Sequence, residues 1–414
     1  MAPPTTRACR PPSERHKIST WTMWRYFTYI IVCALLYSPL LNVRAQSTPA
    51  TTVSTPPMGF VRIDIVGRSD NWISIPVLQP TAATGKVITG TANTVSVEGV
   101  AWVASQWAPP EMEDLSPHAT FYLEFATGHL QGLTYKITGN SADTIVLDVG
   151  SDSLLSHRLG ALAAGDLVRI RPYWTVGTAF SPTGASSLTP FAELPAEAQA
   201  DGGDSLLLFD EETLKVNGLF GGALSNKTPS RRLVRVENTL TSSIPFWRSP
   251  GDTTSNRHGT ILPPLSPVLV RRKNPAPLQF WLLGDAWQTR TVTYLAAGEA
   301  NTPGNDNFVA IARSEPVALK DLQLIDSNAP SQSLFKGNLP GEGREDLILA
   351  FDVAPKGFER PPAYTYFYTL GQGWRELSSS ELAGETLLDP ARVYILRKRP
   401  ASSSGDWTQN GIQP

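Results

Sequence analysis

The chain has 414 residues, of which 35 are basic and 37 acidic, and charged residues make up only 17% of it. This length favours two or three domains, and the charged fraction is below the roughly 25% of an average soluble protein. Abundant Pro (35) and Gly (32) favour short strands joined by turns, and the nearly balanced charge argues against general nucleic-acid binding.

Residues 1–45 have the order of a secretory signal peptide. Basic residues up to Arg25 precede an apolar run over residues 26–37, and Val43-Arg44-Ala45 ends the segment on a small residue. Because the run is shorter than the roughly 18 residues that span a bilayer, we expect cleavage after Ala45 and no membrane span afterwards. A retained anchor helix is the alternative, and Met23 is a second candidate start.

Both cysteines of the chain, Cys9 and Cys33, fall in this leader. The mature protein is therefore expected to lack disulfides and to be stabilised by core burial and sheet hydrogen bonding. Loss of residues 1–45 removes six basic residues and one acidic residue, which leaves 29 basic against 36 acidic side chains. We expect a mildly acidic exported protein of the periplasm, the cell surface or the extracellular space.

The next part of the chain is predicted to be a tether followed by a small β-domain. Residues 46–57 are rich in Ser, Thr and Pro and have no hydrophobic period. Apolar and polar residues alternate over residues 60–65 and 72–77, as they do in half-buried strands. Further short apolar runs with Gly or Asn turns follow up to residue 170, so residues 58–180 are predicted to form a barrel or sandwich.

A sequence repeat follows a linker over residues 181–204. Residues 259–275 align without a gap on residues 384–400. The matched pairs are Gly259 with Gly384, Leu262 with Leu387, Val268 with Val393, Arg272 with Arg397, Lys273 with Lys398, and Pro275 with Pro400.

Features around the matched segments occur in the same order in both copies. In order they are Asp210 and Asp352 after apolar strands, Trp247 and Trp374 before the matched glycine, and Trp287 and Trp407 after Gly-Asp. We predict a duplicated β-module, with a first repeat over residues 205–300, a connecting segment over 301–344, and a second repeat with a tail over 345–414. Helical periodicity is nearly absent, so the predicted fold class is all-β with little helix.

Several of these segments together resemble a known family. They are the strand at residues 58–61, the hairpin region at 120–125, residues 173–178, 307–309 and 364–368, Trp374-Arg375, and the closing strand that ends in Arg397-Lys398. In this pattern the chain is similar to a family of uncharacterised exported proteins that occur as multiple paralogues in Verrucomicrobia-type bacteria. Pro263-Pro264 and Asp389-Pro390 depart from the glycine-rich approach to the closing strand in that family. The resemblance implies an exported β-protein and brings no activity with it.

No residue pattern in the sequence carries a recognisable catalytic or metal-binding motif. There is no Gly-x-Ser-x-Gly, and the four histidines after the leader are too far apart to pair on a metal, so we predict no catalytic residue, metal or cofactor. Asp210 and Asp352 hold corresponding places in the two copies and are the candidate carboxylates of the alternative function, polysaccharide degradation. The basic residues at 271–273 and 397–399 are interpreted as protection of strand edges.

Aromatic residues are the strongest indication of a ligand. Nine of the 11 tryptophans follow the leader, and flat aromatic faces beside polar groups suit sugar rings. Trp247, Trp287, Trp374 and Trp407 are the candidate glycan-binding residues, and core packing is the alternative for all four. The predicted function is a non-enzymatic structural or binding protein of the cell envelope or extracellular space, with a glycan or an envelope protein as its partner.

Overall fold

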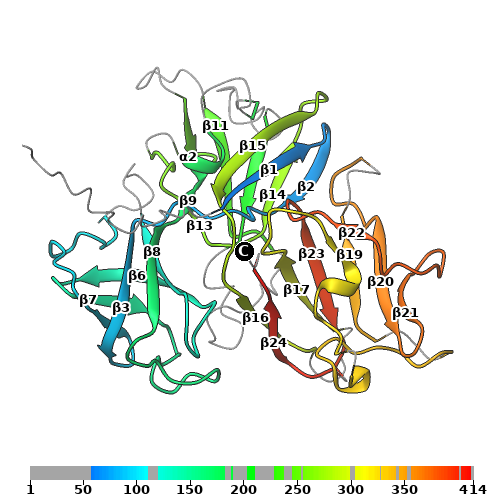
Figure 1. The fold of residues 1–414 in the computed structure, drawn as a ribbon. Coiled ribbons are helices and arrows are strands. Elements are labelled where there is room, and N and C mark those ends of the chain that lie inside the picture. Colours follow the sequence, from blue (N-terminus) through cyan, green and yellow to red (C-terminus); the bar gives the residue numbers. More distant parts are fainter. Residues whose placement is uncertain are drawn as a thin grey trace, which may run out of the picture. The chain divides into compact units, whose positions relative to one another are not determined.

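The computed structural model describes residues 57–110, 120–181, 188–189, 203–209, 228–236, 245–252, 255–298, 304–326, 328–341, 345–351, 356–400 and 402–411. All of these residues belong to one compact unit, Pro56–Pro414. Nearly every element in them is a β-strand (Figure 1), which confirms the predicted all-β fold. The predicted leader, nearly all of the tether, and the candidates Asp210 and Asp352 lie outside the described residues.

Six strands between residues 83 and 172 close into a barrel, in the order β3-β4-β7-β6-β5-β8. Alternate side chains of each strand point inward, so that Val95 and Val97 of β4 and Ile145 and Leu147 of β7 are buried. The small barrel expected in this part of the chain is confirmed, and its closure leaves no free sheet edge. The strands are β3 (Ala83–Gly90), β4 (Thr94–Val97), β5 (Phe121–Phe125), β6 (Thr134–Asn140), β7 (Thr144–Asp148) and β8 (Leu167–Pro172).

The strands on either side of the barrel in sequence form what we call the first module. Its main sheet has the order β12-β11-β10-β14-β2, β1 pairs with β15, and β9 pairs with β13. The barrel is thus inserted between β2 and β9. The elements are β1 (Met58–Ile65), β2 (Ser69–Ile73), β9 (Trp174–Thr175), α2 (Val176–Ala179), β10 (Ser205–Leu208), β11 (Arg231–Val236), β12 (Phe246–Arg248), β13 (Ile261–Leu262), β14 (Val268–Arg272) and β15 (Leu278–Asp285).

The remaining strands form the second module, which has the same topology without an insertion. Its main sheet has the order β17-β23-β19-β20-β21, β16 pairs with β24, and β18 pairs with β22. The elements are β16 (Thr291–Leu295), β17 (Asn305–Ala310), β18 (Val317–Ala318), η1 (Leu319–Asp321), η2 (Pro330–Gln332), β19 (Leu347–Ala350), β20 (Tyr364–Thr369), β21 (Gly373–Glu376), β22 (Leu387–Leu388), β23 (Val393–Lys398) and β24 (Gly405–Gln409).

The observed boundaries differ from the predicted ones. Residues 58–180 were expected to form one domain, whereas β1, β2 and β9 pair with strands of the predicted first repeat. Likewise β16, which falls in the predicted first repeat, pairs with β24 of the second module. Strand pairing joins segments that the inserted barrel separates by about 100 residues, and local sequence patterns do not report such long-range pairs.

Strand register also shifts the expected correspondence by one residue. Arg271 pairs with Asp70 and Ser205, and Arg397 pairs with Asp306 and Leu347. Arg271 therefore corresponds to Arg397, and Arg272 to Lys398. The gapless alignment matched basic residues by type, but consecutive basic residues allow a slip of one position, and a slip of one residue reverses the face of every side chain.

The two main sheets share a hydrophobic cluster to which both modules contribute. Trp72 of β2 lies 4.8 Å from Phe308 of β17, and each ring also contacts Phe209. Because Trp72 and Phe308 hold corresponding positions in the two modules, their contact is isologous, as in a two-fold dimer. The cluster continues with Leu269, Leu347, Leu349, Phe367, Val393 and Ile395.

A buried charge network ties the barrel to the first module. Arg171 of β8 donates to Glu124 of β5 at 2.7 Å and to Asp285 of β15 at 2.6 Å. Thr289 donates to the other Glu124 oxygen at 2.9 Å. All four side chains are buried, so the loss of their hydration must be offset by the ion pairs and hydrogen bonds between them.

We expect truncation at the shared cluster to destabilise the protein strongly. Phe308→Ala removes a buried ring and leaves a cavity between the sheets, which should lower the free energy of unfolding by about 3–5 kcal/mol. Chemical denaturation followed by fluorescence measures this. Phe60→Ala is the control, because Phe60 is 64% exposed, and it should change the same quantity by no more than about 0.5 kcal/mol. Equal effects of the two substitutions would contradict the packing described.

Acid should destabilise the fold through His157. Its Nδ1 accepts the Leu159 N–H at 3.1 Å, and burial lowers the pKa of its imidazole, with Asp152 opposing this effect. Below the ordinary pKa of about 6.5 the unfolded chain binds a proton that the folded protein takes up only at lower pH. The free energy of unfolding should therefore fall from pH 7.5 to pH 5.5, and His157→Asn should reduce this fall. An unchanged pH dependence in the variant would contradict the assignment.

Candidate functional site

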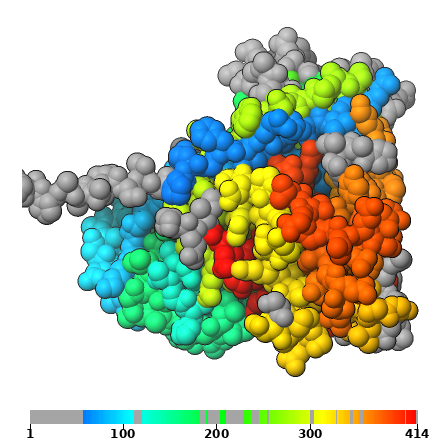
Figure 2. Space-filling view, turned by 45° about the vertical axis from the view of Figure 1, so that its right-hand side comes forward, coloured from blue at the N-terminus to red at the C-terminus, as the bar shows by residue number. Residues whose placement is uncertain are grey.

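A cavity of about 570 Å³ opens beside the main sheet of the second module. We call it the tyrosine cavity. Tyr364 and Tyr366 of β20 and Tyr394 of β23 form part of its wall, and Asp64 of β1 lies at its border. The N-terminal strands and the second module meet in this region, since Ile73 forms a β-bridge with Arg392. In the space-filling view the blue N-terminal strands lie against the orange-red part of the second module (Figure 2).

Two tyrosines form an aromatic platform in this cavity. Tyr364 and Tyr366 are two residues apart on a strand, so their side chains share one face. Their ring centroids are 6.3 Å apart with an interplanar angle of 19°, and Tyr364 is 42% exposed. Tyr394 lies buried beside them, donates to the Asp389 carbonyl oxygen at 3.1 Å, and has its pKa raised by burial. The wall thus offers one accessible aromatic ring beside two buried ones.

The polar part of the wall is mainly acidic. Asp64, Glu376, Glu381 and Asp389 contribute carboxyl groups. Arg392 is the one basic side chain among the described wall residues, and its Nε lies 3.7 Å from the Asp389 carboxylate. A ligand in the cavity would meet several hydrogen-bond acceptors and one strong donor beside an aromatic face.

Serine hydroxyls hold Glu376 in its ionised form. Ser378 and Ser379 both donate to its carboxylate, the latter at 2.9 Å, and these bonds lower the pKa of Glu376. A general acid needs the opposite shift, toward a raised pKa. The described part of the chain also contains no group of three or more His, Cys, Asp or Glu side chains placed to hold a metal ion. The ionised Glu376 carboxylate can accept hydrogen bonds from a ligand in the cavity.

Apart from Asp64, the residues of the tyrosine cavity come from the second module. Strand register and equal loop lengths identify the corresponding positions of the first module. There Arg231, Leu233, Pro263, Ser266 and Val268 stand in place of Tyr364, Tyr366, Asp389, Arg392 and Tyr394. Tyr366 and Tyr394 are also part of the core of the second module, whereas the first module fills these positions with Leu233 and Val268. The matching topology is therefore compatible with different residues at these positions.

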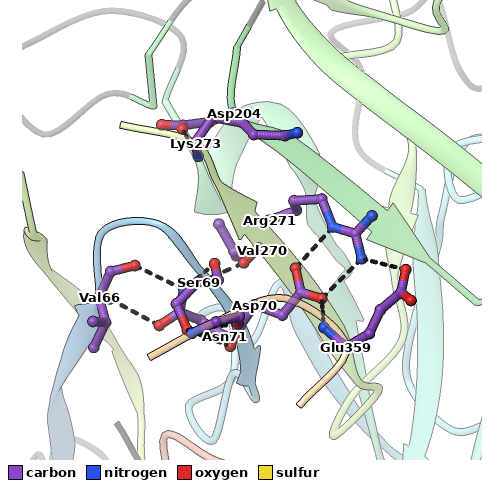
Figure 3. Close-up of polar contacts among 10 residues, drawn as sticks. Val66, Ser69, Asp70, Asn71, Asp204, Val270, Arg271, Lys273 and Glu359 are labelled. Atoms are coloured by element: carbon purple, nitrogen blue, oxygen red, sulfur yellow. Dashed lines mark hydrogen bonds and ion pairs between the residues drawn. The ribbon is translucent and has the colours of Figure 1, made fainter. Parts of the chain in front are cut away.

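Other polar residues recur in both modules and so belong to the scaffold. In the first module Asn71 accepts the Val66 N–H at 2.8 Å, and Asp70 binds Arg271 through two hydrogen bonds of 2.8 Å (Figure 3). In the second, Asn307 accepts the Ala296 N–H at 2.9 Å, and Asp306 binds Arg397 at 2.6 and 2.9 Å. Identical geometry in two modules indicates a structural role.

Two fully buried aspartates complete this scaffold. Asp204 accepts the Thr189 N–H at 2.8 Å and the Arg272 guanidinium at 2.6 Å. Asp346 accepts the Lys336 N–H and the Lys398 ammonium, both at 2.9 Å. Burial lowers the pKa of Lys398, and Asp346 opposes this.

The interpretation of the basic runs as edge protection was wrong. Both runs begin on β14 and β23, which lie inside their sheets with a strand on each side. Arg271 and Arg397 instead neutralise buried or nearly buried aspartates on the neighbouring strand. The sequence pattern showed the charges but not their partners, because the partners lie far away in the chain.

The four candidate tryptophans do not form a ligand surface. Trp247, Trp287, Trp374 and Trp407 are all buried, so none of them presents a ring face to a sugar, and the prediction is corrected. Trp247 donates its indole N–H to the Phe180 carbonyl, and Trp407 donates to that of Leu322, at 2.9 and 2.7 Å. They are core residues, as the alternative interpretation expected. The structure brings together Tyr364 and Tyr366 on β20 instead.

No protein-family model matches this chain, and neither the curated proteins nor the solved structures contain a significant match to it. In the described ranges no helix combines the length and the apolar character needed to cross a bilayer. The geometry of the tyrosine cavity therefore carries the functional assignment.

The Glu376 carboxyl should titrate at low pH. We expect its NMR midpoint to lie below the ordinary value of 4.5, because the two serine hydroxyls stabilise the charged form. Replacement of both serines, Ser378→Ala with Ser379→Ala, should raise the midpoint toward 4.5. A midpoint at or above 4.5 in the unchanged protein would contradict the geometry of this turn.

Proposed function

We propose that this chain is an exported, non-enzymatic protein that binds a glycan in the tyrosine cavity of its second module. The observation that carries the proposal is the stacked pair Tyr364–Tyr366 beside acidic groups and Arg392 in one cavity. Sugars expose C–H groups on the faces of their rings and hydroxyls at the edges, so they need a flat aromatic surface together with polar partners.

The acidic wall narrows the class of glycan. Carboxylates accept hydrogen bonds from hydroxyl and amino groups but repel other anions. The cavity therefore suits neutral or amino-bearing sugars better than uronic or sulfated ones. Its volume of about 570 Å³ lies within the usual range of small-ligand sites, enough for a short stretch of a longer polymer.

Sequence features support the exported location. The leader-like segment at residues 1–45, the Ser/Thr/Pro-rich segment at 46–57 and a mature chain without cysteine fit an envelope or extracellular protein. The resemblance to a family of exported bacterial proteins points the same way. We also infer that the two modules arose by duplication, because they share strand order and the aspartate and asparagine contacts. After duplication one copy would keep the scaffold and change the cavity.

Removal of the exposed ring should weaken binding. Tyr364→Ala deletes an aromatic contact worth about 0.5–1.5 kcal/mol beyond its buried area, so we expect roughly tenfold weaker binding of any glycan selected on an array. Titration calorimetry with the selected glycan measures the loss. Phe358→Ala is the matched control, because Phe358 is 41% exposed in the same module and outside the cavity wall.

Three results would contradict the proposal. Equal weakening by Tyr364→Ala and Phe358→Ala would place the glycan elsewhere. Release of shorter sugars during the titration would favour the degrading alternative. If no glycan binds, and an envelope protein binds the unchanged chain but not Tyr364→Ala, the partner of the cavity would be a protein.

A further inference from the structure

The first module contains a cavity of its own, distinct from the tyrosine cavity. It measures about 300 Å³ and lies between α2 and β15. We call it the α2 cavity. Its wall is mostly aromatic and apolar, with Ala179, Phe180, Phe280, Trp281 and Leu282 among the lining residues. Phe180 and Phe280 meet edge to face, with their centroids 5.8 Å apart.

The second module shows what the same place looks like when it is filled. Phe280 pairs with Ile63, and Trp407 pairs with Thr293. Asn71 accepts the Val66 N–H and Asn307 accepts the Ala296 N–H, so Val66 and Ala296 correspond. Ile63 and Thr293 lie three residues before them and therefore also correspond, as do their pairing partners Phe280 and Trp407.

The neighbouring helical turns correspond as well. Val176 at the start of α2 donates its N–H to the Thr260 carbonyl, and Leu319 at the start of η1 donates to that of Thr386. Three residues further on, Ala179 of the first module corresponds to Leu322 of the second.

In the second module the indole of Trp407 occupies this place. Its side chain is 2% exposed, belongs to the main core cluster, and donates Nε1–H to the Leu322 carbonyl oxygen at 2.7 Å. In the first module the smaller Phe280 is only half-buried and has no N–H to donate. The α2 cavity thus corresponds in place to the Trp407 indole of the second module, and the Trp247 indole of the first module bonds instead to the carbonyl of Phe180, one residue beyond Ala179.

We propose that the α2 cavity is a binding site for an aromatic ring that carries a hydrogen-bond donor, of the indole or phenol class. The ring would contact Phe180 and Phe280 and donate to the Ala179 carbonyl, as Trp407 does to Leu322. A volume of about 300 Å³ is at the lower end for ligand sites, which suits one small aromatic group.

The surroundings of the cavity allow two sources for such a ring. Trp281 at its border is 62% exposed, and the neighbouring pair Phe60 and Leu283 is also exposed. A free aromatic molecule would use the cavity alone. A partner peptide would place a tryptophan or tyrosine side chain in the cavity, and the residues next to it would contact the exposed ring of Trp281 at the border.

Indole is the probe for the site, and Phe280→Trp is the decisive variant. Indole should raise the melting temperature of the full mature chain, because a ligand that binds only the folded state stabilises it. Phe280→Trp should raise the melting temperature without ligand and abolish the further rise with indole. Tyr364→Ala should leave the indole effect unchanged, since the two cavities are separate. An indole effect that persists in Phe280→Trp would overturn the proposal.

Two further measurements keep the test decisive if Phe280→Trp does not fold. Nuclear Overhauser contacts between indole and the methyl groups of Leu188 and Leu282, which both line the cavity, are expected in the unchanged protein. Trp407→Phe should lower the melting temperature and open a second site for indole. Indole should therefore raise the melting temperature of this variant more than that of the unchanged protein. Absence of the Overhauser contacts at saturating indole would overturn the proposal.

Peptides identify the source of the ring. A short extended peptide with a central tryptophan should bind more tightly than indole if a partner supplies the ring, and Trp281→Ser should reduce this gain. Binding of the peptide no tighter than that of indole would assign the site to free aromatic molecules. Failure of both probes to bind would refute the site.

Discussion

Two buried carboxylates, Asp204 and Asp346, control the architecture of the modules. Each lies at the start of the central strand that follows it, and each receives a cation and backbone N–H groups from the end of the adjacent strand. A buried charge is costly unless its hydrogen bonds are satisfied, so only one register of these strands is acceptable. This register determines which side chains of β20 and β23 face the core, and therefore where the tyrosine cavity lies.

Much of the fold class could be predicted from the sequence, because alternation and turn residues are local signals. The all-β class and the barrel follow from them. The sequence also contains a stronger signal: Asp70-Asn71-Trp72-Ile73 and Asp306-Asn307-Phe308-Val309 repeat the same residue types and mark β2 and β17. Their match assigns the strand at Asp70–Ile73 to the duplicated module, although it lies before the barrel. The inserted barrel concealed the first of them by separating it from the rest of its module.

The candidate site was harder to predict, because the exposure of an aromatic residue depends on pairing between distant strands. Trp407 is buried since β24 pairs with β16 and faces η1, while Trp281, on the opposite face of the corresponding ribbon, is exposed. Residue type alone does not tell which of these two tryptophans is buried and which is exposed. Comparison between the modules separates the two cases: shared residues such as Asn71 and Asn307 build the sheet, whereas Tyr364 and Asp389 have no counterpart and line a cavity.

The place of the inserted barrel has a consequence for how the chain folds. The second module is continuous in sequence, so its strand pairs close shorter loops than the corresponding pairs of the first module. In the first module β2 and β9 are separated by the entire barrel. However, Ala83 and Ile170 at the two ends of the barrel pair with each other, so a folded barrel returns the chain to the point where it left. Early closure of the barrel would therefore shorten the effective loop within the first module, and the fold would assemble from the insertion outward on that side.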